Sequence, residues 1–507
     1  MEVIQNLLDG FSVALTWQNL LLALAGCVLG TIIGALPGLG PSNGVAILIP
    51  VVFAMGLPAT PALILLTSVY YGCMYGGRIS SILLNIPGDE PAMMTTLDGY
   101  PMAKRGQAGE ALALSGVASF VGAFVATCGL VLLAPQLVKV ALLFGPAEYF
   151  AMFVFAFATL GGVASTNQAK AAFAAALGLA ISCVGVDGQT GVPRLTFGSM
   201  HFNDGIDFLI AIVGMFAVSE VLFFIEQRGN GQAQTQEPVR SRGLRITLPF
   251  NMIKTSSGAI GRGTLIGFIA GVLPGAGASL GSFLAYVAEK KVAGKTGEFG
   301  KGDARGVAAP EAGNNAAAGG ALVPMLALGV PGSGTTAVLL AILMSLDITP
   351  GPLLFTKNPD VVWGLIAALF IGNIMLLVLN IPLVSIFARV LDIPTHYLMP
   401  GVLLISFLGI YGLSGSTFDL YLLIFFGVLG WVLRKLEIPL VPVILGILLG
   451  VQMERNLRRA LTISDGDWSV FWSTPLSAGL LIAAIIGFVF PIIWGRLIRN
   501  RLRLNED

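Results

Sequence analysis

The sequence is poor in charged residues, and this shortage sets the class of protein. Only 11% of the 507 residues are charged, whereas a soluble globular chain carries about a quarter. The formal net charge is +1, which argues against a nucleic-acid partner because such proteins carry a strong basic excess. With 55% hydrophobic residues and a mean hydropathy of +0.86, the composition predicts an all-α polytopic membrane protein in a lipid bilayer, with roughly ten to twelve transmembrane helices.

Residues that carry covalent or metal chemistry are also scarce. The cysteines stand apart in apolar surroundings, so we interpret them as small buried hydrophobic residues rather than disulfide partners or metal ligands. No P-loop, metal-ligand cluster or Ser/His/Asp arrangement is visible. We therefore expect neither an enzyme nor a bound cofactor. The four cysteines and the two isolated histidines are Cys27, Cys73, Cys128, Cys183, His201 and His396.

One stretch rich in proline and glycine interrupts a long apolar segment. An apolar run that ends at Leu36 is followed by PGLGPSNG, residues 37–44, before the chain becomes apolar again at Val45. Two prolines lack a backbone N–H and the glycines tolerate positive φ, so the sequence predicts a broken helix. Unpaired backbone at membrane depth is tolerated only where it is buried in protein or lines a wet cavity. The stretch is therefore typical of a transporter site between half-helices.

The same stretch occurs a second time. Residues 26–44, GCVLGTIIGALPGLGPSNG, and residues 263–281, GTLIGFIAGVLPGAGASLG, are identical at ten of nineteen positions with a constant offset of 237. A second pair of interruptions follows. Residues 80–101 contain Pro87-Gly88, and residues 324–336 contain Pro331-Gly332, at an offset of 244. Each half thus carries two breaks in the same order, as expected for two homologous repeats with broken helices and re-entrant hairpins.

The repeats suggest a division of the chain. We expect a first transmembrane repeat over 1–226, a polar cytoplasmic linker over 227–262, a second repeat over 263–452, and a C-terminal loop with a last transmembrane helix over 453–507. The excess of Lys and Arg in the linker places it in the cytoplasm. Because no Lys or Arg precedes Arg78, the N-terminus is expected outside. An odd number of crossings in the first half would then invert the two repeats.

The four breaks are the candidate site, because equivalent elements of inverted repeats meet near the bilayer midplane. Half-helix N-termini suit carboxylate groups, while carbonyl and hydroxyl oxygens suit Na⁺. The alternative is that these residues only cap helices and close turns. For Na⁺ the candidates are Ser42, Asn43, Ser279 and Asn315. The expected substrate-binding residues are Gly38, Gly40, Ser42, Asn43, Asn85, Gly88, Gly275, Gly277, Ser279, Asn314, Asn315, Ser333, Gly334, Thr335 and Thr336.

Charged residues near the breaks admit two interpretations each. Arg78 either meets a substrate carboxylate or extends to the membrane interface. Asp89, Glu90 and Asp98 either gate the site or bind a cation, or they lie in a solvated loop. Glu311 either binds a cation or favours the N-terminus of a helix expected to begin at Ala312.

Several motifs together resemble those of one family. GALPGLGPSNGVA, SSILLNIPG, TTLDGYPMAKRGQAGEAL, GVLPGAGASLGSFLAY, APEAGNN and LGVPGSGTTAVLL, spread over both halves, resemble the large membrane subunit of the tripartite tricarboxylate transporter family. The resemblance implies a carrier in the bacterial inner membrane that works with a small membrane subunit of about four helices and a periplasmic solute-binding protein. It also implies carboxylate substrates, with citrate as the type case, and Na⁺ or H⁺ as the coupling ion. Relatives in this family vary in the tract after Pro87-Gly88, and Asp89-Glu90-Pro91 is an acidic version of it.

We therefore expect a secondary active symporter subunit that imports carboxylates such as tricarboxylates. The alternatives are a passive anion channel, which would need a continuous polar face along several spans, and a scaffold membrane subunit without a site of its own. Polarity concentrated at the breaks favours the carrier. The sequence leaves open whether transport uses an elevator-like or a rocking motion.

Overall fold

The computed structural model describes residues 2–162, 167–229, 246, 250–275, 277–392 and 395–503, and these are almost entirely helical. Among them the only strands are β1 (Gly185–Val186) and β2 (Pro193–Arg194), which pair antiparallel. The predicted all-α class is therefore confirmed. It follows from the composition, because a chain in lipid must satisfy its backbone hydrogen bonds within helices or closed barrels.

The first half of the chain forms ten α-helices interrupted by short turns of other helix types. They are α1 (Glu2–Ala14), α2 (Trp17–Ala35), α3 (Gly40–Ala54), α4 (Ala59–Leu84), α5 (Met93–Met102), η1 (Ala103–Gln107), α6 (Ala108–Ala141), α7 (Pro146–Gly162), α8 (Gln168–Ser182), η2 (Met200–Phe202), α9 (Phe208–Val213), η3 (Gly214–Val218) and α10 (Ser219–Gly229).

The second half continues in the same way. Its helices are α11 (Phe250–Val272), α12 (Gly277–Ala293), η4 (Gly294–Thr296), α13 (Ala304–Leu328), α14 (Gly334–Ser345), α15 (Leu354–Lys357), α16 (Pro359–Asn380), α17 (Val384–Ala388), η5 (Arg389–Asp392), α18 (Thr395–Ser414), α19 (Thr417–Lys435), α20 (Leu440–Ile463), α21 (Val470–Ser473) and α22 (Pro475–Arg503).

Six helical segments of the described chain are long and apolar enough to cross a bilayer, and the segment Met93–Ala141 is the longest of them. Shorter apolar helices accompany them, including Gly40–Ala54 and Gly334–Ser345. Each of these two follows a predicted break, and their lengths suit half-helices rather than full crossings. The protein is thus a multi-pass membrane protein with interrupted helices.

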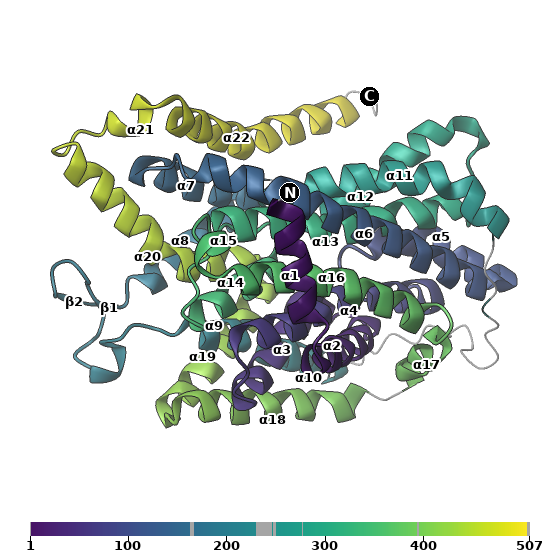
Figure 1. Cartoon of the computed structure of the whole chain (residues 1–507), viewed down its shortest axis with the longest axis horizontal. Coiled ribbons are helices and arrows are strands. Elements are labelled where there is room, and N and C mark those ends of the chain that lie inside the picture. The colour runs from purple at the N-terminus through teal and green to yellow at the C-terminus, as the bar shows by residue number, and fades with distance from the viewer. Residues whose placement is uncertain are drawn as a thin grey trace.

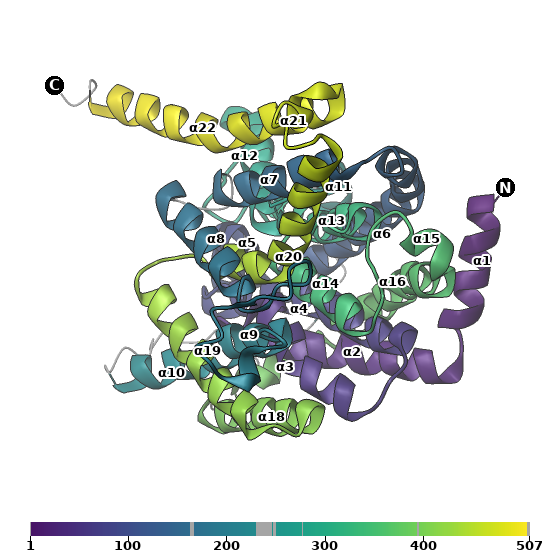
Figure 2. The same ribbon diagram turned by 90° about the vertical axis from the view of Figure 1, so that its left-hand side faces the viewer.

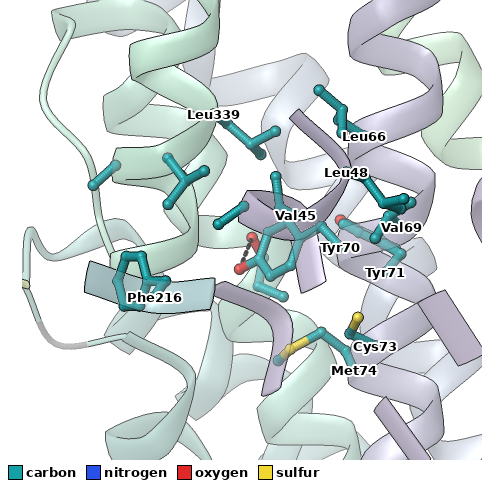
Figure 3. Close-up of a cluster of buried hydrophobic side chains, with 14 of the residues drawn as sticks. Val45, Leu48, Leu66, Val69, Tyr70, Tyr71, Cys73, Met74, Phe216 and Leu339 are labelled. Atoms are coloured by element: carbon teal, nitrogen blue, oxygen red, sulfur yellow. Dashed lines mark hydrogen bonds between the residues drawn. The ribbon is translucent and has the colours of Figure 1, made fainter. Parts of the chain in front are cut away.

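The arrangement places the broken helices in the interior. In Figures 1 and 2, α18 and α22 lie at opposite edges of the molecule, while α4, α13 and α14 lie between them. Nearly every residue of α13 is buried, as expected for a helix that is apolar and small all round. Figure 3 shows part of this core, where Val45 of α3, Tyr70 of α4 and Leu339 of α14 come together.

Glycines hold two helix pairs in backbone contact, and the two pairs match. A methyl group on Gly30 of α2 would lie 2.3 Å from the carbonyl oxygen of Val69 in α4. A methyl group on Gly267 of α11 would lie 2.1 Å from the carbonyl oxygen of Gly313 in α13. Gly267 follows Gly30 by 237 residues and Gly313 follows Val69 by 244, the two offsets found in the sequence. Small residues permit such approaches between membrane helices.

The observed starts of α3 and α11 refine two expectations. The first break is shorter than the PGLGPSNG stretch, because α3 already begins at Gly40 with Pro41 in its first turn, where proline is tolerated. The predicted linker 227–262 lies partly outside the described residues. At its described end it is helical, since α11 begins at Phe250 and buries Ser256 and Ala259. The division into two repeats with these boundaries stays a prediction.

Candidate functional site

Within each half, the two helix breaks are tied together by one backbone hydrogen bond. In the first half the N–H of Gly38 donates to the carbonyl oxygen of Gly88 at 3.2 Å, and in the second half the N–H of Gly275 donates to that of Gly332 at 3.1 Å. Gly38 and Gly275 have φ values of 85° and 80°, which only glycine adopts at little cost. Gly38 and Gly275 therefore play the same role, because each connects the two breaks of its own half.

Across the halves, the breaks contact each other reciprocally. The hydroxyls of Ser42 and Thr335 lie 3.0 Å apart, and the hydroxyl of Ser279 donates to Glu90 Oε2 at 3.3 Å. Ser279 is the counterpart of Ser42 in the second repeat, so each serine reaches the second break of the opposite half. The first break of each half thus contacts the second break of the other half. All four breaks therefore meet in one region.

Helix N-termini converge on this region in two capping states. At the second breaks, side chains accept from backbone N–H groups: Asp89 Oδ1 accepts from the N–H of Ala92 at 2.9 Å in the turn before α5, and Ser333 forms a capping box with Thr336 at the start of α14. At the start of α3, by contrast, no side chain of the described residues caps the helix. Its free N–H groups and positive dipole end are suited to an anion. Gly277 begins α12, the counterpart of α3.

Asn85 has a different place from the other predicted site residues. It ends α4 in the left-handed conformation with φ 58°, as its counterpart Gly329 ends α13 with φ 71°. Asn85 is exposed. Asparagine is the residue that best replaces glycine at this helix terminus, so the local role of Asn85 is to end a helix.

The structure also adds a residue that the sequence did not single out. Asn43 donates to Glu220 Oε2 at 3.3 Å, and Glu220 in α10 forms an ion pair with Arg434 of α19. Because Gly38 also lies near Glu220, this acid links the first break to the surrounding helices. The available signal was an isolated acid at the start of the run SEVLFF.

Two predicted site residues on α13 are fully enclosed. Asn314 is 0% exposed, and neither its amide oxygen nor its amide nitrogen has a partner among the described residues. Asn315 donates to the carbonyl oxygen of Glu311 at 3.1 Å, while its own Oδ1 has no described partner. Such buried groups are rare in native proteins and call for an explanation, for example a water or an ion.

Glu311 does not lie at a helix N-terminus, so that interpretation was wrong. It is fully buried within α13, which begins at Ala304 after the Asp303 cap. Its carboxylate accepts from the hydroxyls of Thr95 at 2.5 Å and Ser119 at 3.1 Å. The expected helix start at Ala312 was therefore too late in the sequence.

Arg78 does not extend to the membrane interface, and that expectation was wrong. Its side chain is 0% exposed. The guanidinium donates to the carbonyl oxygens of Tyr75 at 3.0 Å, Leu112 at 2.5 Å and Asn380 at 2.9 Å, and to the hydroxyl of Ser115 at 2.6 Å. These bonds join α4, α6 and α16. Because the Arg78 guanidinium donates to acceptors of the protein itself, we interpret it as a residue that connects helices rather than as a substrate contact.

Asp98 is not part of a solvated loop either. It is buried, and its Oδ1 accepts from the backbone N–H groups of Gly300 and Gly302 at 2.8 Å and of Asp303 at 2.9 Å. Its Oδ2 accepts from the hydroxyl of Tyr286 at 3.0 Å. The carboxylate therefore fixes the loop between α12 and α13 from a helix of the other half.

The hydrogen bonds between Asp98 and the loop before α13 lead to a testable prediction. Replacing Asp98 with alanine should leave three backbone donors without a partner and release the loop, at a cost of about 3 kcal/mol. Trypsin should then cut after Lys301 several times faster than in the unchanged protein, as followed by mass spectrometry. Glu298→Ala is the control, because Glu298 is an exposed acid of the same loop. Equal cleavage rates for both variants would show that Asp98 does not hold the loop.

The geometry defines a class of protein. A helical membrane protein whose two related halves each break two helices, and whose four breaks meet at polar groups and helix N-termini, has a construction known from membrane transporters. The comparison with family models agrees: residues 20–445 match the Tripartite tricarboxylate transporter TctA family. The chain belongs to this family and is thus a membrane subunit of a transporter rather than a member of an enzyme family.

Two curated relatives come from Agrobacterium vitis. One is described as an uncharacterized 52.8 kDa protein in the TAR-I ttuC′ 3′ region and is 38% identical over 510 residues, covering 100% of both chains. The other, an uncharacterized protein in the TAR-II ttuC′ 3′ region, is 39% identical over 244 residues, which is 48% of this chain and 100% of the relative. No solved structure matches the chain.

Proposed function

We propose that this protein is the large membrane subunit of a secondary active symporter that imports carboxylates, with citrate and other tricarboxylates as the first candidates, driven by Na⁺ or H⁺. The observation that carries the proposal is the reciprocal contact of the four breaks, Ser42 with Thr335 and Ser279 with Glu90. It forms one polar region shared by both halves, and the two repeats are proposed to be inverted in the membrane. Relative motion of the halves would open the region to one side at a time.

The substrate is proposed to bind at the uncapped start of α3. Free N–H groups there can meet a carboxylate without a buried positive side chain, whose desolvation would be costly. The neighbouring hydroxyls of Ser42 and Thr335 are half-buried and buried, so they can exchange their mutual hydrogen bond for one to substrate. A small four-helix membrane subunit and a periplasmic solute-binding protein are the proposed partners, and the bacterial inner membrane is the proposed location.

The direct test is uptake of radiolabelled citrate into proteoliposomes that contain this protein and its small subunit, with the binding protein outside. We expect accumulation above the external concentration with an inward Na⁺ or H⁺ gradient, and no accumulation when both gradients are collapsed. Equilibration of citrate without a gradient would instead indicate a passive channel. Absence of uptake of every carboxylate in a panel would indicate a scaffold subunit.

The same assay tests the break residues. Replacing Ser42 and Ser279 with alanine should reduce uptake at low substrate concentration by about tenfold, because a hydrogen bond to a charged group contributes about 1.5–3 kcal/mol. The matched control is Ser345→Ala, at the far end of α14, where the hydroxyl only donates to the carbonyl oxygen of Ile342. If the double variant transports as fast as the control, substrate does not bind at these breaks.

A further inference from the structure

A carboxylate of the protein itself lies at the first break. Asn43, in the first turn of α3, donates from its side-chain amide to Glu220 Oε2 at 3.3 Å. A methyl group on Gly38 would lie 3.6 Å from Glu220 Oε1, so both carboxylate oxygens lie against the break. A negative group is favourable beside a helix N-terminus. The first break therefore already holds a group with the chemistry of a carboxylate substrate.

Glu220 is anchored to a pair of closely packed helices. It is 7% exposed and forms an ion pair with Arg434 of α19. The Arg434 guanidinium also lies over the ring of Phe223 in α10, 4.6 Å from its centre. A methyl group on Gly430 of α19 would lie 2.9 Å from the carbonyl oxygen of Met215 in η3, so the two backbones are in contact. Glu220 thus extends to α3 from the unit that α10 and α19 form.

A π-helical turn ends two residues before Glu220. It spans Gly214–Val218, and α10 continues the same helix from Ser219. Such turns are rare, change which residues face a given side of the helix, and are frequent at functional sites. The helix geometry thus gives a reason to assign a functional role to Glu220 that is independent of its contacts.

The two contacts of Glu220 differ in strength. The bond with Arg434 joins opposite charges, whereas the bond from Asn43 is a single one at 3.3 Å, longer than the usual N–H···O distance of about 2.9–3.0 Å. Gly38 is exposed and Asn43 is half-buried, so a small solute can reach them. An incoming carboxylate can therefore replace Glu220 at Asn43 while Glu220 stays paired with Arg434.

We propose that Glu220 sets the affinity for substrate by occupying the position of a substrate carboxylate beside Asn43. This inference rests on the proposed function, in which a carboxylate binds at the start of α3. Substrate displaces the Glu220 carboxylate from Asn43, and Arg434 continues to neutralise Glu220. When substrate leaves, Glu220 returns and accepts from Asn43 again. Glu220 thus acts as a competitor of substrate within the protein.

The test is a citrate titration of the thermal unfolding of the purified full-length protein, with succinate as a second probe. A ligand that binds the folded state raises the unfolding temperature, and the midpoint of this response reports the affinity. Glu220→Gln should lower the citrate midpoint about tenfold, because a neutral amide competes for Asn43 less well than a carboxylate does. Removal of a residue that contacts substrate would raise the midpoint instead.

Two further variants separate competition from net charge and from misfolding. Glu220→Gln combined with Arg434→Gln removes both charges of the ion pair, and the low midpoint should persist. A return to the midpoint of the unchanged protein would show that net charge alone causes the effect, and would overturn the proposal. Glu220→Asp keeps the charge but shortens the side chain, so it should also lower the midpoint. It decides alone if Glu220→Gln is not recovered folded.

The matched control is Glu226→Gln. Glu226 joins the same two helices, since it pairs with Lys435 at 2.5 Å and accepts from the indole N–H of Trp431 at 2.8 Å, and its midpoint should be unchanged. A Glu220→Gln midpoint equal to or above that of the control would overturn the proposal, as would the absence of any response to both probes. The proposed function would survive either result if carboxylate accumulation in proteoliposomes is gradient-driven. A lowered midpoint without such accumulation would overturn the function and leave the role of Glu220 standing.

Discussion

Replacing Arg78 with methionine is expected to destabilise the protein by about 3–5 kcal/mol. The substitution keeps much of the side-chain volume but removes the guanidinium hydrogen bonds that join α4, α6 and α16, and a hydrogen bond from a charged group contributes about 1.5–3 kcal/mol. Arg78→Lys should recover only part of the loss, because a compact ammonium cannot reach acceptors as far apart as Leu112 and Asn380. The measurement is the thermal unfolding midpoint in detergent.

Arg455→Met serves as the matched control for this experiment. Arg455 is an exposed arginine of α20, so removal of its charge should leave the unfolding midpoint nearly unchanged. A midpoint for Arg78→Met as high as that of the control would mean that the guanidinium does not hold the helices together.

The second large effect is expected at the glycines that hold α2 against α4 and α11 against α13. Gly30→Ala and Gly267→Ala would each place a methyl group 2.1–2.3 Å from a backbone carbonyl oxygen. A backbone cannot rotate away as a side chain can, so the helices must separate, at a cost of about 3 kcal/mol or more. We expect a strongly reduced yield of folded protein, read by size-exclusion chromatography.

Gly261→Ala is an internal control on α11. Nothing lies within 4 Å of a methyl group at this position, and alanine is the better helix former, so the change should be neutral or slightly stabilising. Comparable losses for Gly261→Ala and Gly267→Ala would show that helix propensity rather than close packing decides the effect.

Duplicated features were the ones that the sequence predicted well. The all-α membrane class and the two breaks in each half follow from apolar runs and from glycine and proline. The signal was strong because it occurred twice at fixed offsets. Single charged residues were predicted poorly, as Arg78, Asp98 and Glu311 show.

The reason for these errors is physical. Whether a charge in an apolar chain is solvated or buried depends on acceptors and donors that are far away in sequence. Asp98 is buried because three N–H groups about 200 residues later surround it, and Arg78 is buried because Asn380 is among its acceptors. The residues next to Arg78 and Asp98 in the sequence do not indicate these distant hydrogen-bond partners. For Glu311 the error lay in the helix start, because α13 begins at Ala304 instead of Ala312.

The reciprocal contacts at the breaks also bear on how the two halves depend on each other. Each half completes its own polar loops with a hydroxyl or carboxylate from the other, so a single half on its own would present unfinished loops. The polar region is therefore complete only when both halves are folded against each other.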